Sequence, residues 1–260
     1  MIDALVQQVK NREPRAAMLA AQIGPAANPA LLALLADPTA KVRRIALYCL
    51  KETGGADAVR AFVASLGDVD AQVRAAAMDG LDARHAEADP GLATALLDAH
   101  DRAADAALKQ PLALLLGRLA DTDRARLRAL LDAETAPLPR EALLAACARL
   151  GDRDAQRDFS ELLQGARGDA LERWLPLAEY VGAPWLLPAL LPALDDETPV
   201  VQIGVDGRPE LPTFLTARDV AAKLIAAITG HTFSFAPGPP PSLGPAEVAE
   251  VRAFVEKTSP

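Results

Sequence analysis

The chain consists of short segments in which apolar residues recur at helical spacing, separated by polar turns that contain glycine, proline or aspartate. The segment from Lys41 to Gly55, KVRRIALYCLKETGG, shows the pattern most clearly. Its apolar residues follow one another at three- or four-residue intervals, which places them on one face of a helix, and glycines follow the last of them. The pattern therefore predicts an amphipathic helix that ends at the glycines.

The same pattern recurs at regular intervals. Val73 and Arg74, in QVRAAAMDGLD, stand 31 residues after Val42 and Arg43. More degraded copies surround three further arginines and a looser first copy surrounds a fourth: Arg140, Arg173, Arg218 and Arg15. In the fourth repeat the arginine is missing, and Asp105 stands where the period places it. Such a self-match is typical of a repeat array, in which each unit buries its apolar face against its neighbours.

We therefore predict an all-α fold for residues 1–230, a right-handed α-α superhelix of about seven helical hairpins. In each hairpin we call the first helix A and the second helix B. The expected helices cover residues 2–10, 13–23, 28–36, 41–55, 55–66, 70–83, 89–100, 102–119, 121–132, 137–150, 152–164, 169–181, 183–196 and 217–229.

Three features interrupt or follow the array. Residues 196–216 form a longer loop insertion, in which VVQIGV followed by Asp206-Gly207 predicts a small β-hairpin, because Asp-Gly favours a tight type I′ turn. Residues 231–245 are rich in proline and indicate a linker. Residues 246–260 predict a C-terminal helix that packs back on the array and caps its exposed apolar end.

The hairpins resemble the HEAT repeat family, particularly the short HEAT-like repeats first associated with phycobilisome lyases and the uncharacterised bacterial HEAT-repeat proteins. The resemblance covers about residues 12–230 and rests on the turn and the start of the B helix: Asp37-Pro38 with Val42-Arg43, and Asp68 with Val73-Arg74. In HEAT-like repeats such aspartates and arginines typically stack between neighbouring units as a structural ladder. The resemblance therefore implies a scaffolding role for Arg43 and Arg74. Arg140 and Arg173 lack the preceding valine and the aspartate at the same offset.

Composition and charge narrow the possible functions. The chain is 51% hydrophobic but only 4% aromatic, which favours helices packed closely over small side chains. The formal net charge is −8, and the excess lies in residues 131–260, which carry 11 basic and 19 acidic side chains. Because binding to a phosphate backbone depends on clustered lysine and arginine, we expect no nucleic-acid partner.

The cysteines and the N-terminal sequence indicate the cellular compartment in which we expect the protein. Cys49 and Cys147 fall within expected B helices, so we interpret them as reduced core thiols and not as a disulfide or zinc ligands. The N-terminal sequence MIDALVQQVKNREPR has no apolar signal region, and no uninterrupted apolar run approaches the roughly 18–20 residues that cross a bilayer. We therefore expect a cytoplasmic protein with no membrane partner.

No group of residues indicates catalysis. His85, His100 and His231 form no His-x-x-x-His or His-Glu pair, so we expect no metal site and no iron-hydroxylase centre. His85 and His100 are expected at exposed turns between helices. Neither a glycine-rich phosphate loop nor a Gly-x-Ser-x-Gly motif occurs, so we expect no cofactor and no enzymatic activity. The alternative is a HEAT-like ligand carrier or a chromophore-lyase-type enzyme on the same scaffold, which a deep apolar pocket would favour.

The remaining candidate for a functional site is the surface of the repeat array. In a HEAT-type stack the B helices line the concave side, the usual partner-binding face. Positions one and five residues after each repeat arginine should point outward together, and Lys51 follows one turn later. The candidate protein-binding residues are Arg44, Tyr48, Lys51, Asp79, Glu141, Trp174, Asp219 and Lys223. Trp174 has an alternative role in filling a gap between helices. The loop 198–214 either binds another chain or packs over the seventh repeat. We therefore hypothesise a non-catalytic scaffold or adaptor that binds an unidentified protein.

Overall fold

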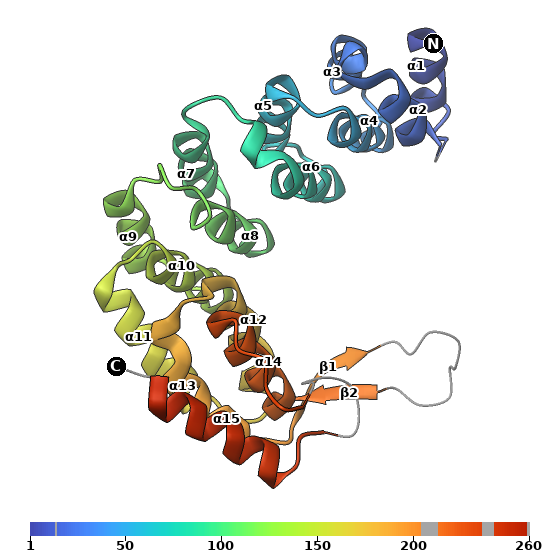
Figure 1. Cartoon of the computed structure of the whole chain (residues 1–260). Coiled ribbons are helices and arrows are strands. Elements are labelled where there is room, and N and C mark those ends of the chain that lie inside the picture. The colour runs from blue at the N-terminus through green and yellow to red at the C-terminus, as the bar shows by residue number, and fades with distance from the viewer. Residues whose placement is uncertain (14, 204–212, 236–241, 259–260) are drawn as a thin grey trace. The chain divides into compact units, whose positions relative to one another are not determined.

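The computed structural model describes residues 1–13, 15–203, 213–235 and 242–258. Almost all of the regular structure in these residues is helical, with a single two-stranded sheet (Figure 1). The predicted all-α superhelical class is confirmed. The chain divides into two compact units, unit 1 from Met1 to Leu143 and unit 2 from Leu144 to Pro260.

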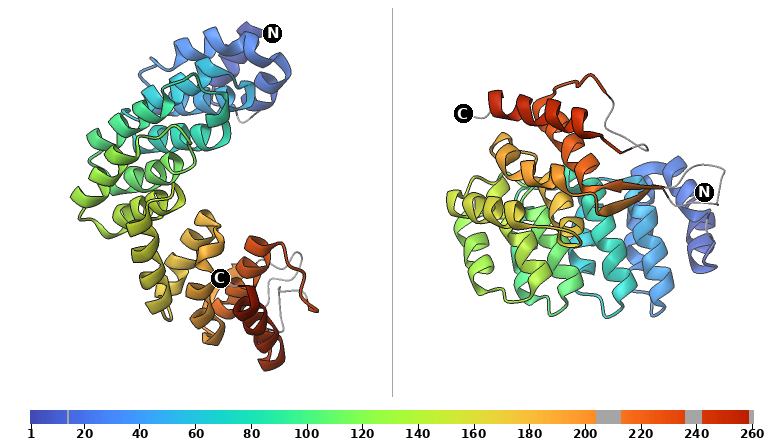
Figure 2. Two further views of the ribbon diagram at one scale, coloured as in Figure 1. Left: turned by 60° about the vertical axis from the view of Figure 1, so that its left-hand side comes forward. Right: turned by 90° about the horizontal axis from the view of Figure 1, so that it is seen from below.

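Unit 1 is a row of helical hairpins, with A helices along one side and B helices along the other (Figures 1 and 2). The A helices are α1 (Ile2–Lys10), α3 (Asn28–Leu34), α5 (Ala56–Ser65), α7 (Leu92–Arg102) and α9 (Arg124–Ala133). The B helices are α2 (Ala16–Ile23), α4 (Ala40–Thr53), α6 (Ala71–Arg84), α8 (Ala106–Leu116) and the start of α10 (Pro137–Arg149). From α4 to α8, each B helix packs against the B helix before it, so the hairpins stack in sequence order.

Local sequence explains where these helices begin and end. Asp70, Asp105 and Asp123 each precede a helix, and each carboxylate accepts a hydrogen bond from a backbone N–H in the first turn. At the other end, α4 stops at Gly54, whose φ of 70° lies in the left-handed region that favours glycine. The helix predicted from the Lys41 to Gly55 pattern is therefore confirmed.

The core of unit 1 consists mainly of alanine and leucine, which lets neighbouring helices approach closely. A close approach occurs at Gly80 of α6, where an added β-carbon would lie 2.5 Å from the ring of Phe62 on α5. Cys49 of α4 is buried, and burial raises the pKa of its thiol to about 12. Cys147 of α10 is buried as well. Both cysteines therefore occupy the core positions that the sequence predicts.

One segment of the described chain, Ala16–Leu34, is long and apolar enough to cross a membrane by length and composition alone. In the structure it is divided. α2 ends at Gly24, whose φ is 71°, and a 3₁₀ turn leads into α3. Both α2 and α3 pack on α4, and Ala20 and Leu31 are fully buried. The segment thus supplies parts of two successive hairpins.

Unit 2 contains the rest of α10, a further hairpin, a segment broken by prolines, a β-hairpin and two C-terminal helices. Its elements are α11 (Arg153–Gly165), α12 (Ala170–Val181), α13 (Leu187–Leu190), β1 (Pro199–Ile203), β2 (Thr213–Thr216), α14 (Ala217–Thr229) and α15 (Pro245–Thr258). Two 3₁₀ segments, Pro184–Leu186 and Leu191–Asp195, flank α13. Proline lacks an N–H and usually kinks or breaks a helix beyond its first turn, and Pro188 and Pro192 follow Pro184 at four-residue spacing, which explains why this stretch forms three short pieces.

The predicted β-hairpin within residues 196–216 is confirmed in its two strands. β1 and β2 pair antiparallel, with Val201 opposite Leu215. β2 packs on α14, which buries Leu215, whereas Val201 and Phe214 are 41% and 40% exposed. The expected turn at Asp206-Gly207 lies outside the described residues.

The C-terminal helix α15 packs on α14, and a buried carboxylate holds the chain that leads into it. Asp219 of α14 accepts hydrogen bonds from the backbone N–H of Leu243 at 3.0 Å and from the hydroxyl of Ser242 at 2.8 Å. Part of the linker predicted over 231–245, namely 236–241, lies outside the described residues. The contact of Asp219 fixes where the chain enters α15.

Candidate protein-binding surface

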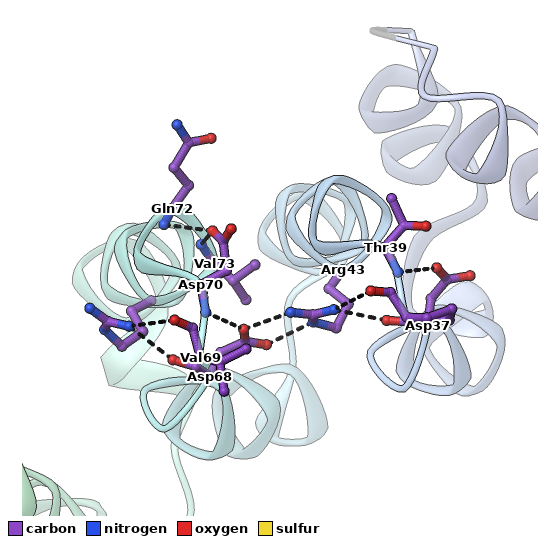
Figure 3. A network of polar contacts seen from close by, with 10 residues as sticks. Asp37, Thr39, Arg43, Asp68, Val69, Asp70, Gln72 and Val73 are labelled. Carbon is purple, nitrogen blue, oxygen red and sulfur yellow. Dashed lines mark hydrogen bonds and ion pairs between the residues drawn. The ribbon is translucent and has the colours of Figure 1, made fainter.

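A ladder of ion pairs joins the B helices α4, α6 and α8 of unit 1 each to the residues just before the next B helix. Arg43 on α4 donates two hydrogen bonds to the carboxylate of Asp68, at N···O distances of 2.7 and 2.8 Å (Figure 3). Its remaining terminal nitrogen donates to the backbone carbonyls of Asp37 and Pro38 in the preceding turn. The bonded guanidinium holds the pKa of Asp68 below its ordinary value. The scaffolding role implied for Arg43 is confirmed.

Two further ion pairs continue the ladder. Arg74 on α6 pairs with Asp105 at 3.0 Å and donates to the backbone carbonyl of Asp68. Lys109 on α8 pairs with Glu134, before α10, at 2.7 Å. The fourth repeat therefore keeps its cation. The sequence period places Asp105 at the arginine position. In the structure Asp105 is instead the acidic partner of Arg74 in the preceding ion pair, and Lys109, four residues later, takes the place of the arginine.

The buried positions of α8 confirm this register. Leu108, Leu112 and Leu116 are buried at the same offsets from Lys109 at which Val42, Ala46 and Leu50 are buried relative to Arg43.

The register differs in unit 2. Arg218 of α14 donates to the backbone carbonyls of Leu194 and Leu243, at 2.8 and 3.0 Å, and so ties together the chain on both sides of its helix. Arg140 of α10 and Arg173 of α12 are exposed.

Four of the predicted binding residues lie together on α4 and α6. Tyr48 is 39% exposed. Lys51 pairs with Asp79 at 2.7 Å, and this hydrogen bond raises the pKa of Lys51. Arg44 donates to the side chain of Gln72, while its Nε is buried without a hydrogen-bond partner. We call these five residues, Arg44, Tyr48, Lys51, Gln72 and Asp79, the B-face patch.

The B-face patch adjoins a groove between α6 and α8, with a volume of about 300 Å³. Its apolar lining comes from Met78, Pro111, Leu114 and Leu115. Asp79 belongs to both the patch and the groove, and Asp82 pairs with Arg118 across it. Sequence reasoning missed the groove because no arginine marked α8. Counted from Lys109, the fifth following residue is Leu114, the position that Tyr48 holds relative to its own arginine.

Two predicted binding residues do not face solvent. Trp174 of α12 is 5% exposed and packs edge-on against Phe159 of α11, with ring centroids 5.2 Å apart. Asp219 is 2% exposed because it caps the start of its own helix and holds the linker. The prediction that these two side chains point outward is wrong, and Trp174 fills a gap between helices. Lys223 is exposed as expected, and Glu141 is half-buried.

The described residues contain no group of three or more His, Cys, Asp and Glu side chains that converge on a common point. His85 is half-buried, and its Nδ1 lies 3.0 Å from the carbonyl of Asp82. His100 is only 2% exposed, and neither ring nitrogen has a hydrogen-bond partner. Burial lowers the pKa of His100. The expected exposure of His100 is wrong, because α7 continues to Arg102 and keeps the ring inside the helix packing.

The fold and the ladder define the class of protein: a helical-repeat protein in which ion pairs join successive hairpins. Residues 28–53, which contain α3, the following turn and α4, match the family model described as HEAT repeat. The chain therefore carries a HEAT repeat, and the expected resemblance to that family is confirmed. No curated protein sequence matches the chain.

Several solved structures are similar to the chain. The complex of CpcE and CpcF of phycocyanin lyase from Nostoc sp. PCC7120 matches at 15% identity and a TM-score of 0.51, over 99% of this chain and 94% of that chain. Human deoxyhypusine hydroxylase in complex with glycerol matches at 18% identity and a TM-score of 0.37, over 98% and 94%. An engineered protein matches at 15% identity and a TM-score of 0.41, over 98% and 72%. The first likeness supports the fold alone, and the other two carry no argument.

Proposed function

We propose that this chain is a non-catalytic protein-binding scaffold, and that its partner docks on the B-face patch and the adjoining α6/α8 groove. Tyr48 carries the proposal. It is a tyrosine, 39% exposed, on a surface otherwise made of charged and amide side chains. Aromatic side chains serve as anchors in protein interfaces because they bury a large apolar area and add a polar group at the tip.

The charged residues around Tyr48 suit the rim of an interface. Lys51 with Asp79, and Arg118 with Asp82, pair across neighbouring B helices. These contacts order long side chains before a partner arrives, which lowers the entropic cost of docking. A partner with an apolar side chain for the groove and polar groups around it would match this surface.

The absence of catalysis is part of the proposal. The displaced pKa values of Arg43, Asp68, Lys51 and Glu134 all have a structural ion pair as their leading cause. Active sites also displace pKa values, but they do so by gathering ionisable groups in a cleft. In this chain these four groups belong to three ion pairs that lie along unit 1 and join neighbouring hairpins. The pattern supports a scaffold.

Comparative capture from the native source tests the proposal. The baits are the wild-type chain, Tyr48→Ala and Val69→Ala, each cross-linked and quantified by mass spectrometry. Val69, in the turn before α6, is 92% exposed and is the matched control for losing an exposed apolar side chain. A partner of the B-face patch should bind wild type and Val69→Ala alike, and Tyr48→Ala at least about tenfold less.

Equal capture by all three baits would refute a docking site at Tyr48. Recovery of the chain alone, with monomeric sedimentation, would refute the scaffold role itself. The alternative of a ligand carrier finds support in one observation, a second groove in unit 1 that lies away from the B helices.

A further inference from the structure

A second groove runs between the A helices α5 and α7 of unit 1. One part has a volume of about 490 Å³ and is lined mostly by apolar side chains, among them Val59, Leu92 and Ala95. A second part, of about 350 Å³, shares Val63 and Ala64 with the first. The two parts therefore adjoin along α5 and α7, and we call them together the A-helix groove.

The groove lies where the connection between hairpins is long. Two glycines join α4 to α5, whereas residues 85–91 join α6 to α7. Part of this connection, Ala88 to Gly91, lines one end of the groove. Along the rest, the walls include the small residues Ala64, Gly67 and Ala99, whose side chains leave the space between the helices open.

The polar groups at the two ends of the groove differ. Arg60, beside the start of α7, pairs with both Asp57 and Asp89, so its charge is balanced. Arg102, at the end of α7, is exposed, and its Nε donates to the backbone carbonyl of Asp98 at 3.0 Å. Among the described residues no carboxylate pairs with Arg102. One end of the apolar groove therefore offers an uncompensated guanidinium.

We propose that the A-helix groove binds a medium-chain aliphatic carboxylate, with its hydrocarbon chain along α5 and α7 and its carboxylate at Arg102. The lining of α5 runs from Val59 to Ala64, a rise of roughly 8 Å, and continues through Leu66 and Gly67 in the following turn, which together match an extended acyl chain. Small-molecule sites typically have volumes of roughly 300–1,000 Å³, mostly apolar walls and a few polar groups that fix orientation. Arginine is suited to the headgroup because its planar fork donates two parallel hydrogen bonds to a carboxylate. This site goes beyond the proposed docking of a protein and uses none of the residues of the B-face patch.

Titration of the purified full chain with dodecanoate, kept below its critical micelle concentration and followed by calorimetry, tests the groove. Ala64→Trp places a large side chain across both parts of the groove, and the exposed position of Ala64 lets the helix accept it. Ala83→Trp is the matched control, since Ala83 is an exposed alanine on α6 outside the groove. We expect saturable binding by wild type and Ala83→Trp, and its loss in Ala64→Trp. No saturable binding by wild type, or equal binding by Ala64→Trp, would overturn the proposal.

The headgroup is tested by Arg102→Gln and by dodecanol, which has the same chain without the charge. We expect Arg102→Gln to weaken dodecanoate binding up to about fivefold, the size of an exposed ion pair, and to leave dodecanol binding unchanged. Arg15→Gln removes an arginine whose side chain is 77% exposed near the N-terminus, and it should change neither ligand. If Arg102→Gln leaves dodecanoate unchanged, or weakens both ligands equally, the carboxylate assignment fails.

Discussion

Replacing Arg43 by methionine should cause a large loss of stability with a specific origin. Methionine keeps an unbranched stem for packing but removes the guanidinium, so the carboxylate of Asp68 and two carbonyls of the preceding turn lose their donor. The side chains of Arg43 and Asp68 are only 12% and 13% exposed, so water cannot fully replace the lost contacts. Removing one partner of a buried ion pair costs about 3–5 kcal/mol, and the residual exposure reduces the expected loss to about 2–4 kcal/mol.

The assay is a double-mutant cycle in urea, comparing the free energies of unfolding of wild type, Arg43→Met, Asp68→Asn and the double variant. We expect a coupling energy of about 2 kcal/mol. Arg60 and Asp89 form a matched control pair with side chains 60% and 54% exposed, and their coupling should stay below about 1 kcal/mol. A coupling for Arg43 with Asp68 no larger than that of the control pair would refute the reasoning.

The same ion pair should make the stability of the fold depend on pH. The pKa of Asp68 is lower in the folded chain than the value of about 3.9 expected in the unfolded chain. Its contribution to stability is therefore fully present above that value and is lost as the pH falls through the folded pKa. The difference in stability between wild type and Arg43→Met should shrink below about pH 4.

Three further predictions concern the core and its boundary with the surface. Gly80→Ala should lower the free energy of unfolding by about 1–3 kcal/mol, although alanine favours helices, because its β-carbon would lie 2.5 Å from the Phe62 ring. Adding Phe62→Leu should recover part of the loss in urea unfolding, and no recovery would contradict the clash. Stability should fall as the pH drops below about 6.5, because burial lowers the pKa of His100 and the unfolded chain therefore protonates this imidazole at a higher pH than the folded chain does. His100→Leu should flatten this part of the profile, and an unchanged profile would assign it to another group. Trp174→Ala should cost about 3–5 kcal/mol and Tyr48→Ala about 1 kcal/mol or less, and equal losses would contradict their assignment to core and surface.

The ladder could be predicted from sequence because its letters repeat at fixed offsets. Arg43 and Asp68 belong to a pattern that a second copy confirms, and neighbouring repeats bring them into contact whatever the curvature of the stack. The outward positions are harder to predict from sequence, because they depend on the register of each helix. In α12 the buried stripe, which includes Trp174 and Ala178, lies two residues earlier relative to Arg173 than the stripe of α4 does relative to Arg43. A shift of two residues turns an outward position toward the core.

The burial of Asp219 and the α6/α8 groove depend on contacts that no single repeat encodes. Counted from Arg218, Asp219 holds an outward position, yet the segment leading to α15 folds over it and Leu243 bonds to its carboxylate. The groove depends on α8, where the cation is a lysine displaced by four residues. When the sequence is analysed one repeat at a time, it cannot show that a later segment will cover the outward face of a helix. Nor can it show that a connection of unusual length has shifted the register of a following B helix.

The ladder also determines how unit 1 should respond to tension. Each ion pair joins residues that are near in sequence: Arg43 and Asp68 are 25 residues apart, and Arg74 and Asp105 are 31 apart. No ladder contact described in unit 1 skips a hairpin, so the hairpins are connected in series and each bears the full load along the row. Under a pull between its ends, we expect the row to extend by releasing one hairpin at a time and to recoil quickly, because re-forming each contact closes only a short loop. The row of hairpins in unit 1 would then be extensible and elastic under load, and not stiff.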